Sequence, residues 1–214
     1  EKIDEFESML NELCGYQSAG QHLYRKQQEL DVLCKKTSFS RQEIKLLYWG
    51  WKVACPEGIL DERTFKDIYA QFFPQAGDAS LYAHFVFNAM FSETLAKNNG
   101  QITFLDYACA LSTLIRGTIG DKIKFIWTLY DINKDGKITY EEVLQISIAI
   151  YGLLGFNVAP AHNLRTYEEH AKRVFAKLDT AKVGYITYDQ FKEICIKDET
   201  IFKSMESLDT SAML

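Results

Sequence analysis

Residues 131–142 constrain this chain more than any other segment, because oxygen-bearing side chains recur there at alternate positions. The segment reads Asp-Ile-Asn-Lys-Asp-Gly-Lys-Ile-Thr-Tyr-Glu-Glu. Oxygens stand at positions 1, 3 and 5, glycine permits a sharp turn at position 6, and a glutamate at position 12 can supply two oxygens. Calcium is a hard cation that takes about six to eight oxygen ligands, and this spacing wraps one short loop around it. The segment therefore predicts a calcium-binding loop.

We expect this loop to bind one calcium ion, with magnesium as a competitor. Lys137 contributes its backbone carbonyl rather than its side chain, and Thr139 at position 9 acts through a water molecule. The remaining ligands are side-chain oxygens. The predicted metal ligands are Asp131, Asn133, Asp135, Lys137 and Glu142.

Four segments at regular spacing share a glycine followed two residues later by Ile or Leu, at Gly58, Gly100, Gly136 and Gly184. Their spacing of about 40 residues is typical of a supersecondary unit that is used several times. Apolar residues recur at helical spacing on both sides of the segments. A loop of this type between two helices is an EF-hand, so the sequence predicts four EF-hands.

EF-hands pair through short strands in their loops, so we expect an all-α fold with two paired lobes and additional helices at both termini. Turn-forming residues after Phe73 and near Gly117 mark the breaks between hands and between lobes. The predicted organisation is a variable N-terminal helical segment (1–40), a first EF-hand pair (41–116), a second pair (118–196), and a C-terminal helix and tail (197–214).

Two of the other three loops lose their calcium ligands by plain substitution. Apolar side chains stand where oxygens are required, and the glutamate at position 12 is replaced by Thr or Gln. Neither loop is therefore expected to bind calcium. The substituted positions are Val53, Cys55 and Thr64 in the loop at 53–64, and Ala181, Val183 and Gln190 in the loop at 179–190.

The remaining loop, counted back from Gly100, runs from Leu95 to Asp106. Leu95 and Lys97 then stand where carboxylates are needed, and a lysine places positive charge against the ion. The stretch before Gly100 is also long for a standard loop. An unusual ion-binding loop within 91–106 is the open alternative, with ligands drawn from Ser92, Glu93, Asn98 or Asn99.

The composition argues against several functional classes. A net charge of −5 leaves no general basic surface for nucleic acid. No run reaches the about 18 apolar residues that a membrane span needs. The four histidines show no metal-binding or catalytic spacing, so no enzyme activity is predicted.

The five cysteines are odd in number and contain no CxxC motif, which is typical of reduced thiols in the cytosol. We therefore expect a cytoplasmic protein. Membrane contact would then be indirect, through a partner, and acylation of Cys14 or Cys34 is the alternative route.

Four blocks of sequence resemble the neuronal calcium sensor family. They are Cys55-Pro-Glu-Gly58, Thr64-Phe-Lys-Asp-Ile-Tyr-Ala-Gln-Phe-Phe-Pro74, Tyr82-Ala-His-Phe-Val-Phe-Asn-Ala89 and Leu114-Ile-Arg-Gly-Thr118. Together they are most similar to the potassium-channel-interacting proteins, the subgroup that includes calsenilin. The resemblance covers roughly residues 40–205. The fourth hand departs from the subgroup because it lacks key ligands, and the second hand is rebuilt, so this chain looks like a divergent member.

The resemblance implies an auxiliary subunit of A-type voltage-gated potassium channels that modulates channel trafficking and inactivation. In that subgroup the N-terminal helix of the channel lies in a hydrophobic groove, and a C-terminal helix, here 201–208, can occupy or leave that groove. The candidate groove residues are Leu47, Trp51, Phe65, Ile68, Tyr69, Phe72, Phe73, Phe85, Phe87, Leu111 and Leu114. Because the loops of the first pair are degenerate, we expect partner binding with or without calcium.

Two other functions remain open at this point. One is a calcium-dependent transcriptional repressor of the calsenilin type, for which the candidate basic residues are Lys35, Lys36, Arg41 and Lys45. The acidic balance of the chain argues against direct contact with DNA phosphates. The other is a calcium-sensing regulatory subunit of a phosphatase, which would also bind a helix in a groove.

Overall fold

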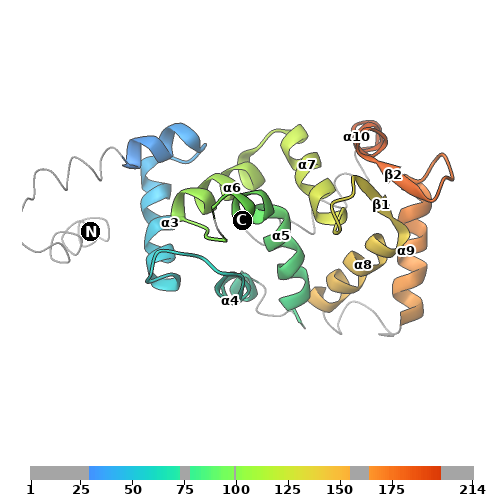
Figure 1. The fold of residues 1–214 in the computed structure, drawn as a ribbon, viewed down its shortest axis with the longest axis horizontal. Coiled ribbons are helices and arrows are strands. Elements are labelled where there is room, and N and C mark those ends of the chain that lie inside the picture. Colours follow the sequence, from blue (N-terminus) through green and yellow to red (C-terminus); the bar gives the residue numbers. More distant parts are fainter. Residues whose placement is uncertain (1–28, 73–77, 99, 155–163, 199–214) are drawn as a thin grey trace, which may run out of the picture.

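The computed structural model describes residues 29–72, 78–98, 100–154 and 164–198, which are helical apart from one small sheet (Figure 1). The all-α prediction is confirmed. Cys14, Phe73, Asn99 and the helix expected at 201–208 lie outside the described residues. The elements are a helical segment at 29–36, α3 (Arg41–Ala54), α4 (Glu62–Phe72), α5 (Ser80–Lys97), α6 (Phe104–Arg116), α7 (Ile119–Tyr130), β1 (Lys137–Thr139), α8 (Tyr140–Leu154), α9 (Leu164–Leu178), β2 (Tyr185–Thr187) and α10 (Tyr188–Lys197).

The helices form two pairs of hands whose loops meet back to back. In the C-terminal half, β1 and β2 pair antiparallel, with Ile138 opposite Ile186. In the N-terminal half, the corresponding contact is a single antiparallel bridge between Leu60 and Ile102. All four side chains are 0% exposed, so each loop contributes one apolar residue to the core at the same position of the repeat.

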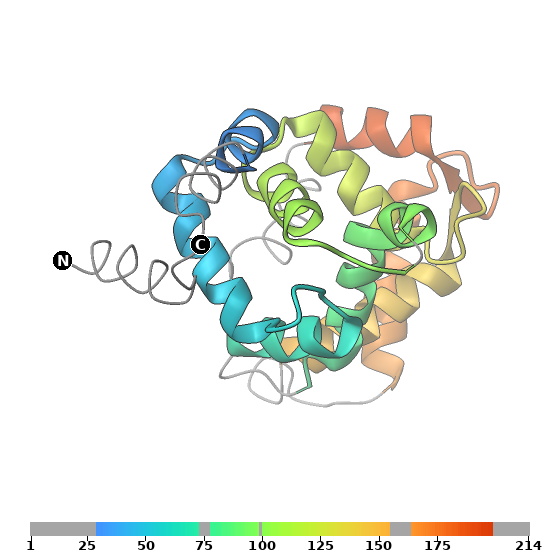
Figure 2. The ribbon, with the colours of Figure 1, turned by 60° about the vertical axis from the view of Figure 1, so that its left-hand side comes forward.

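Helix α5 joins the two halves into one continuous core. Its buried residues include Tyr82, Phe85 and Phe87, which lie on different sides of the helix. The helix therefore packs against α4 in the N-terminal half and against α7 and α8 in the C-terminal half (Figures 1 and 2). One buried cluster extends from Trp51 to Cys195. The loops thus pair as two lobes, but the helices share one large core, beside which Phe39, Ile44 and Leu111 form a smaller buried cluster.

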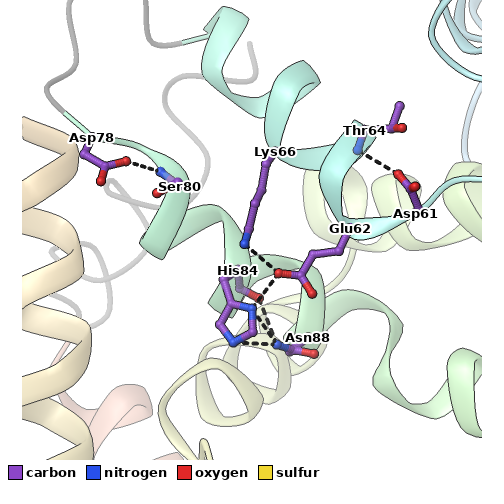
Figure 3. Close-up of polar contacts among 8 residues, drawn as sticks. All are labelled: Asp61, Glu62, Thr64, Lys66, Asp78, Ser80, His84 and Asn88. Carbon is purple, nitrogen blue, oxygen red and sulfur yellow. Dashed lines mark hydrogen bonds and ion pairs between the residues drawn. The ribbon is translucent and has the colours of Figure 1, made fainter.

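Polar contacts fix α5 at both of these faces. Glu62 Oε1 of α4 lies 2.7 Å from His84 Nδ1 of α5 and 2.6 Å from Lys66 Nζ, and Figure 3 shows the three side chains gathered beside Asn88. Just before α5, the backbone N–H of Asp78 donates to the carbonyl of Gly152 in α8 (3.0 Å). Helix α5 is therefore tied to both halves by polar contacts as well as by apolar packing.

The last residue of α6 anchors the start of α3. The Arg116 guanidinium binds the carboxylate of Glu43, donates to the carbonyl of Ser38 (2.6 Å) and lies 4.9 Å from the centre of the Phe39 ring. The chain then turns at Gly117, where a Cβ atom would lie 2.1 Å from the carbonyl oxygen of Thr113. Only glycine fits this junction between the two halves.

The described cysteines are free thiols, and two of them, Cys55 and Cys195, are buried. Burial raises the pKa of the Cys195 thiol to about 11, which keeps it protonated and unreactive. Cys34 is half-buried. Among the described helices, none is both long and apolar enough to cross a membrane.

We predict that Glu43→Gln reduces stability more at pH 7 than at pH 3. Hydrogen bonds from Arg116, and then from the Ser40 backbone, lower the pKa of Glu43 from 4.5 to about 2. Because the folded-state pKa is depressed, the carboxylate stabilises the fold above pH 4.5, and this contribution is lost as the pH falls toward 2. Urea unfolding of both proteins at pH 7 and pH 3 measures the difference. An equal difference at both pH values would contradict the prediction.

Candidate metal centre

The loop between α7 and α8 has the turn that its sequence predicts. Lys134 and Gly136 both adopt positive φ angles, of 59° and 80°. Glycine is favoured at the second of these positions because it carries no Cβ to clash there. The turn allows Glu142, at the end of the loop, to accept hydrogen bonds from backbone N–H groups at the start of the loop.

Asp131 is the feature of this loop that most favours a bound cation. Its side chain is 6% exposed, and Oδ2 accepts a hydrogen bond from the backbone N–H of Gly136 (3.1 Å). Within the described part of the chain, the buried Oδ1 has no hydrogen-bond partner. Burial raises the pKa of this carboxyl, and the charges of Glu142 and Asp135 raise it further. A buried carboxylate oxygen without a donor is costly, and a cation would satisfy it.

Glu142 connects the two ends of the loop. It is 4% exposed, and its Oε1 accepts from the backbone N–H groups of Ile132 (3.1 Å) and Asn133 (3.3 Å). Its Oε2 accepts from the backbone N–H (2.8 Å) and the hydroxyl (2.8 Å) of Thr139. Glu142 therefore also caps the first turn of α8, so the loop keeps its shape through its own hydrogen bonds.

Asn133 and Asp135 hold the middle of the loop. The N–H of Asp135 donates to Asn133 Oδ1 (2.9 Å), and the N–H of Lys137 donates to Asp135 Oδ1 (2.9 Å). Among the described residues, no three Asp, Glu, His or Cys side chains are already gathered as a metal-binding group. The donors are all oxygens, as calcium requires, and the open oxygen of Asp131 fits a cation. The residues that would hold it are the five predicted ligands, with Lys137 acting through its carbonyl.

The fourth loop, at 179–190, has the same backbone turn, with φ angles of 55° at Lys182 and 85° at Gly184. Its first carboxylate, however, is fully engaged. Asp179 Oδ1 accepts from the N–H of Val183 (3.0 Å), and Oδ2 accepts from the N–H of Gly184 (2.8 Å). Gln190 Oε1 accepts from the backbone N–H and hydroxyl of Thr187, as Glu142 does in the third hand. This loop is closed by its own hydrogen bonds.

The second loop is shorter than its sequence predicts. Helix α5 continues through Leu95 to Lys97, so the segment between α5 and α6 begins only at Asn98. Asn98 Nδ2 donates to Asp106 Oδ2 (3.4 Å), and Asp106 accepts from the N–H of Thr103 (3.0 Å) as the cap of α6. Two side chains proposed for an unusual site, Ser92 and Glu93, lie within α5, where Glu93 pairs with Lys97 at 3.5 Å.

The first loop is also held without acidic ligands at its start. Cys55, at position 3, is buried, and its backbone N–H donates to the carbonyl of Trp51 as the end of α3 (2.7 Å). At the other end, Asp61 Oδ1 accepts from the N–H of Thr64 (2.8 Å) and caps α4 (Figure 3). In this loop a buried thiol thus replaces an oxygen ligand at position 3, and the carboxylate at position 9 is used to cap α4.

The structure buries most of the candidate groove residues. Those that are buried are Trp51, Phe65, Tyr69, Phe85, Phe87, Leu111 and Leu114. Leu47 and Ile68 are half-buried, the Phe72 side chain is not described, and Phe73 lies outside the described residues. Buried side chains present little surface to a partner, so in this conformation the seven residues act as core.

A different apolar surface is exposed on α3. Leu46, Trp49 and Val53 are 68%, 52% and 67% exposed. They lie three and four residues apart, so they share one face of the helix, which we call the α3 outer face. The opposite face of α3 buries Ile44 and Trp51. The signal for this second face was present in the sequence, as three apolar residues outside the inward-facing set.

Residues 121–196 match the protein family described as an EF-hand domain pair. The match begins inside α7 and ends inside α10, so it spans the third and fourth hands. It confirms the EF-hand prediction for this half of the chain. The protein therefore contains an EF-hand domain pair.

We predict that Asp131→Asn abolishes stabilisation by calcium without destabilising the calcium-free protein at neutral pH. Burial raises the pKa of Asp131, so its ionised form opposes folding at pH 7, and the amide removes that charge. For the wild type, calcium at 100 times its dissociation constant should add about 2.7 kcal/mol. Thermal unfolding in calcium and in chelator measures both effects. The control is Glu141→Gln, an exposed carboxylate in the first turn of α8, and equal calcium stabilisation of Asp131→Asn and wild type would contradict the prediction.

We further predict that the triple variant Ala181→Asp, Val183→Asp, Gln190→Glu binds a second calcium ion. These changes restore side-chain oxygens at positions 3, 5 and 12 of a loop that already has the required turn. Calorimetric titration should give two ions per chain for the variant and one for the wild type. A variant that still binds one ion would show that loop geometry, rather than ligand identity, disables the fourth hand.

Proposed function

We propose that this protein is a calcium-binding regulatory subunit that binds an apolar helix of a partner protein. The observation that carries the proposal is the contrast among the loops. One loop keeps a buried carboxylate oxygen, Asp131 Oδ1, for which the described residues offer no hydrogen-bond donor, while the fourth loop satisfies the equivalent oxygen internally. A chain with a single such site is poorly suited to buffering calcium, since buffers use several strong sites.

The set of ligands indicates a sensor rather than a tight buffer. Three carboxylates, one amide and a backbone carbonyl correspond to dissociation constants of about 10⁻⁷ to 10⁻⁵ M. Calcium in the third hand would act directly on α7 and α8, which flank the loop. Both helices pack against α5, which also packs against α4. The first pair of hands would therefore sense calcium mainly through α5, and also where α6 contacts α7.

The partner surface in this proposal is the α3 outer face. Three exposed apolar side chains at helical spacing suit the apolar stripe of an amphipathic helix. The loops that position α3 and α4 lack calcium ligands, so this face should be available whether or not calcium is bound. The sequence resemblance to potassium-channel-interacting proteins supports a specific partner, the N-terminal helix of an A-type voltage-gated potassium channel. Binding would place the protein at the cytoplasmic side of the membrane through that channel.

We predict that a peptide from such a channel N-terminus binds the purified protein with less than a tenfold difference, about 1.4 kcal/mol, between calcium and chelator. Trp49→Glu should weaken binding at least about tenfold, because it places a charge in the apolar contact. The matched control is Ile196→Glu, which alters an equally exposed apolar residue on α10 (59% exposed). Calorimetric titration measures the peptide affinity of the wild type in calcium and in chelator, and the affinities of the two variants.

Three results would count against the proposal. No binding of the peptide in either condition would reject the channel as partner. A loss of more than tenfold in peptide affinity in chelator would mean that calcium in the third hand controls partner binding. Equal weakening by Trp49→Glu and Ile196→Glu would reject the α3 outer face as the contact surface.

A further inference from the structure

The third and fourth loops have nearly the same backbone but engage their first aspartate differently. Asp131 and Asp179 both accept from the N–H of the glycine five residues later, at 3.1 Å and 2.8 Å. The second oxygen of Asp179 also accepts a bond, from the N–H of Val183 (3.0 Å). The second oxygen of Asp131 has no partner among the described residues.

The two loops differ in the side chain at position 3. In the third loop, the N–H of Asp135, at position 5, donates to Asn133 Oδ1 (2.9 Å). In the fourth loop, position 3 is Ala181, which has no oxygen. The N–H at position 5 donates to Asp179 instead. The loss of one ligand therefore closes the fourth loop on its own carboxylate.

The closed turn leads directly into the sheet that the third loop uses. Gly184 precedes β2, and β2 pairs with β1 in the register Lys137 to Thr187 and Thr139 to Tyr185. The ammonium group of Lys137 also lies 4.5 Å from the centre of the Tyr185 ring. The backbone carbonyl of Lys137 is a predicted calcium ligand. Thr139 donates its N–H and its hydroxyl to the carboxylate of Glu142. The fourth loop thus holds in place two residues of the third.

We propose that Asp179 is a positioning residue for calcium binding in the third hand. Its carboxylate takes the place of an ion in the fourth loop, where it holds the turn and, through β2, presets β1 and the Lys137 carbonyl. Two bonds from backbone N–H groups to a charged acceptor are strong enough for this role. The inference rests on the proposed calcium binding by the third hand. It extends that proposal by giving the metal-free fourth hand a function.

The test compares Asp179→Ala, which loses both acceptors, with Asp179→Asn, which keeps one. Asp189→Ala is the control, because Asp189 is an exposed carboxylate of the same loop, in the first turn of α10. Calorimetry gives the calcium affinity of each full-length variant. Hydrogen exchange in chelator gives the protection of the amides in β1 and β2 relative to those in α3 to α6.

We expect Asp179→Ala to weaken calcium binding about tenfold, Asp179→Asn to fall between it and wild type, and Asp189→Ala to stay within about threefold. Protection should fall in β1 and β2 but not in α3 to α6, which a general loss of stability would not produce. If Asp179→Ala and Asp179→Asn both bind calcium with wild-type affinity, the role of Asp179 is overturned, while the proposed calcium binding by the third hand is unaffected. If Asp179→Ala does not fold, wild-type affinity and protection in Asp179→Asn would also overturn it. Absence of calcium binding by the wild type would overturn the calcium proposal and the inference together.

Discussion

The structure depends on one small set of hydrogen bonds, which joins the end of each loop to the helix that follows it. In the second, third and fourth hands, the residue at position 9 donates to the side chain at position 12. The acceptors are Asp106, Glu142 and Gln190. In the first hand the bond runs the other way, from the N–H of Thr64 to Asp61. Each of these caps fixes where the second helix starts, and each is worth about 1 kcal/mol.

Because these caps need no metal, the protein can lose calcium ligands and keep four hands. The capping role at position 12 accepts Glu, Gln or Asp, and in the first hand Asp61 at position 9 takes it over, whereas bidentate binding of calcium requires a carboxylate at position 12. Sequence change at this position can therefore remove the ion and leave the fold intact. The buried residues at position 8, from Leu60 to Ile186, then hold the loops together in pairs. In the proposed account calcium binds one loop, while the caps of all four hands form without an ion.

The shared core explains how a single site could still matter to the whole chain. Helix α5 is buried against α4 on one side and against α7 and α8 on the other. Its start is held by Gly152 of α8, and its middle by Glu62 of α4. A change in the angle between α7 and α8 would alter their packing against α5. Because the loops of the first pair lack calcium ligands, contacts with α7 and α8 are the route by which calcium would affect that pair in the proposed account.

The sequence was sufficient for the repeat, because the glycine at position 6 and the apolar residue two positions later have direct physical causes. The five calcium ligands stay a prediction. The sequence was insufficient for the second loop, because Leu95 to Lys97 are helix formers and nothing before Asn98 stops α5. The sequence also does not determine which aromatic residues are buried in the core and which are exposed to a partner. Helical spacing marks Phe85 as apolar and inward, but burial depends on what packs above it, and the structure places it in the core. The exposed face of α3 was overlooked because the helix carries apolar residues on two opposite faces, and the sequence does not say which of the two is buried.

In the proposed account one loop of four binds calcium, while the other three keep their shape through internal hydrogen bonds. Backbone NMR during a calcium titration distinguishes the four loops, since each reports through the amide of its own position-6 glycine. The account predicts that the Gly136 amide, which donates to Asp131, shifts strongly and saturates at one equivalent of calcium. The amides of Gly58, Gly100 and Gly184 should show no second saturation step. A large shift at any of these three glycines with a second equivalent would contradict the account.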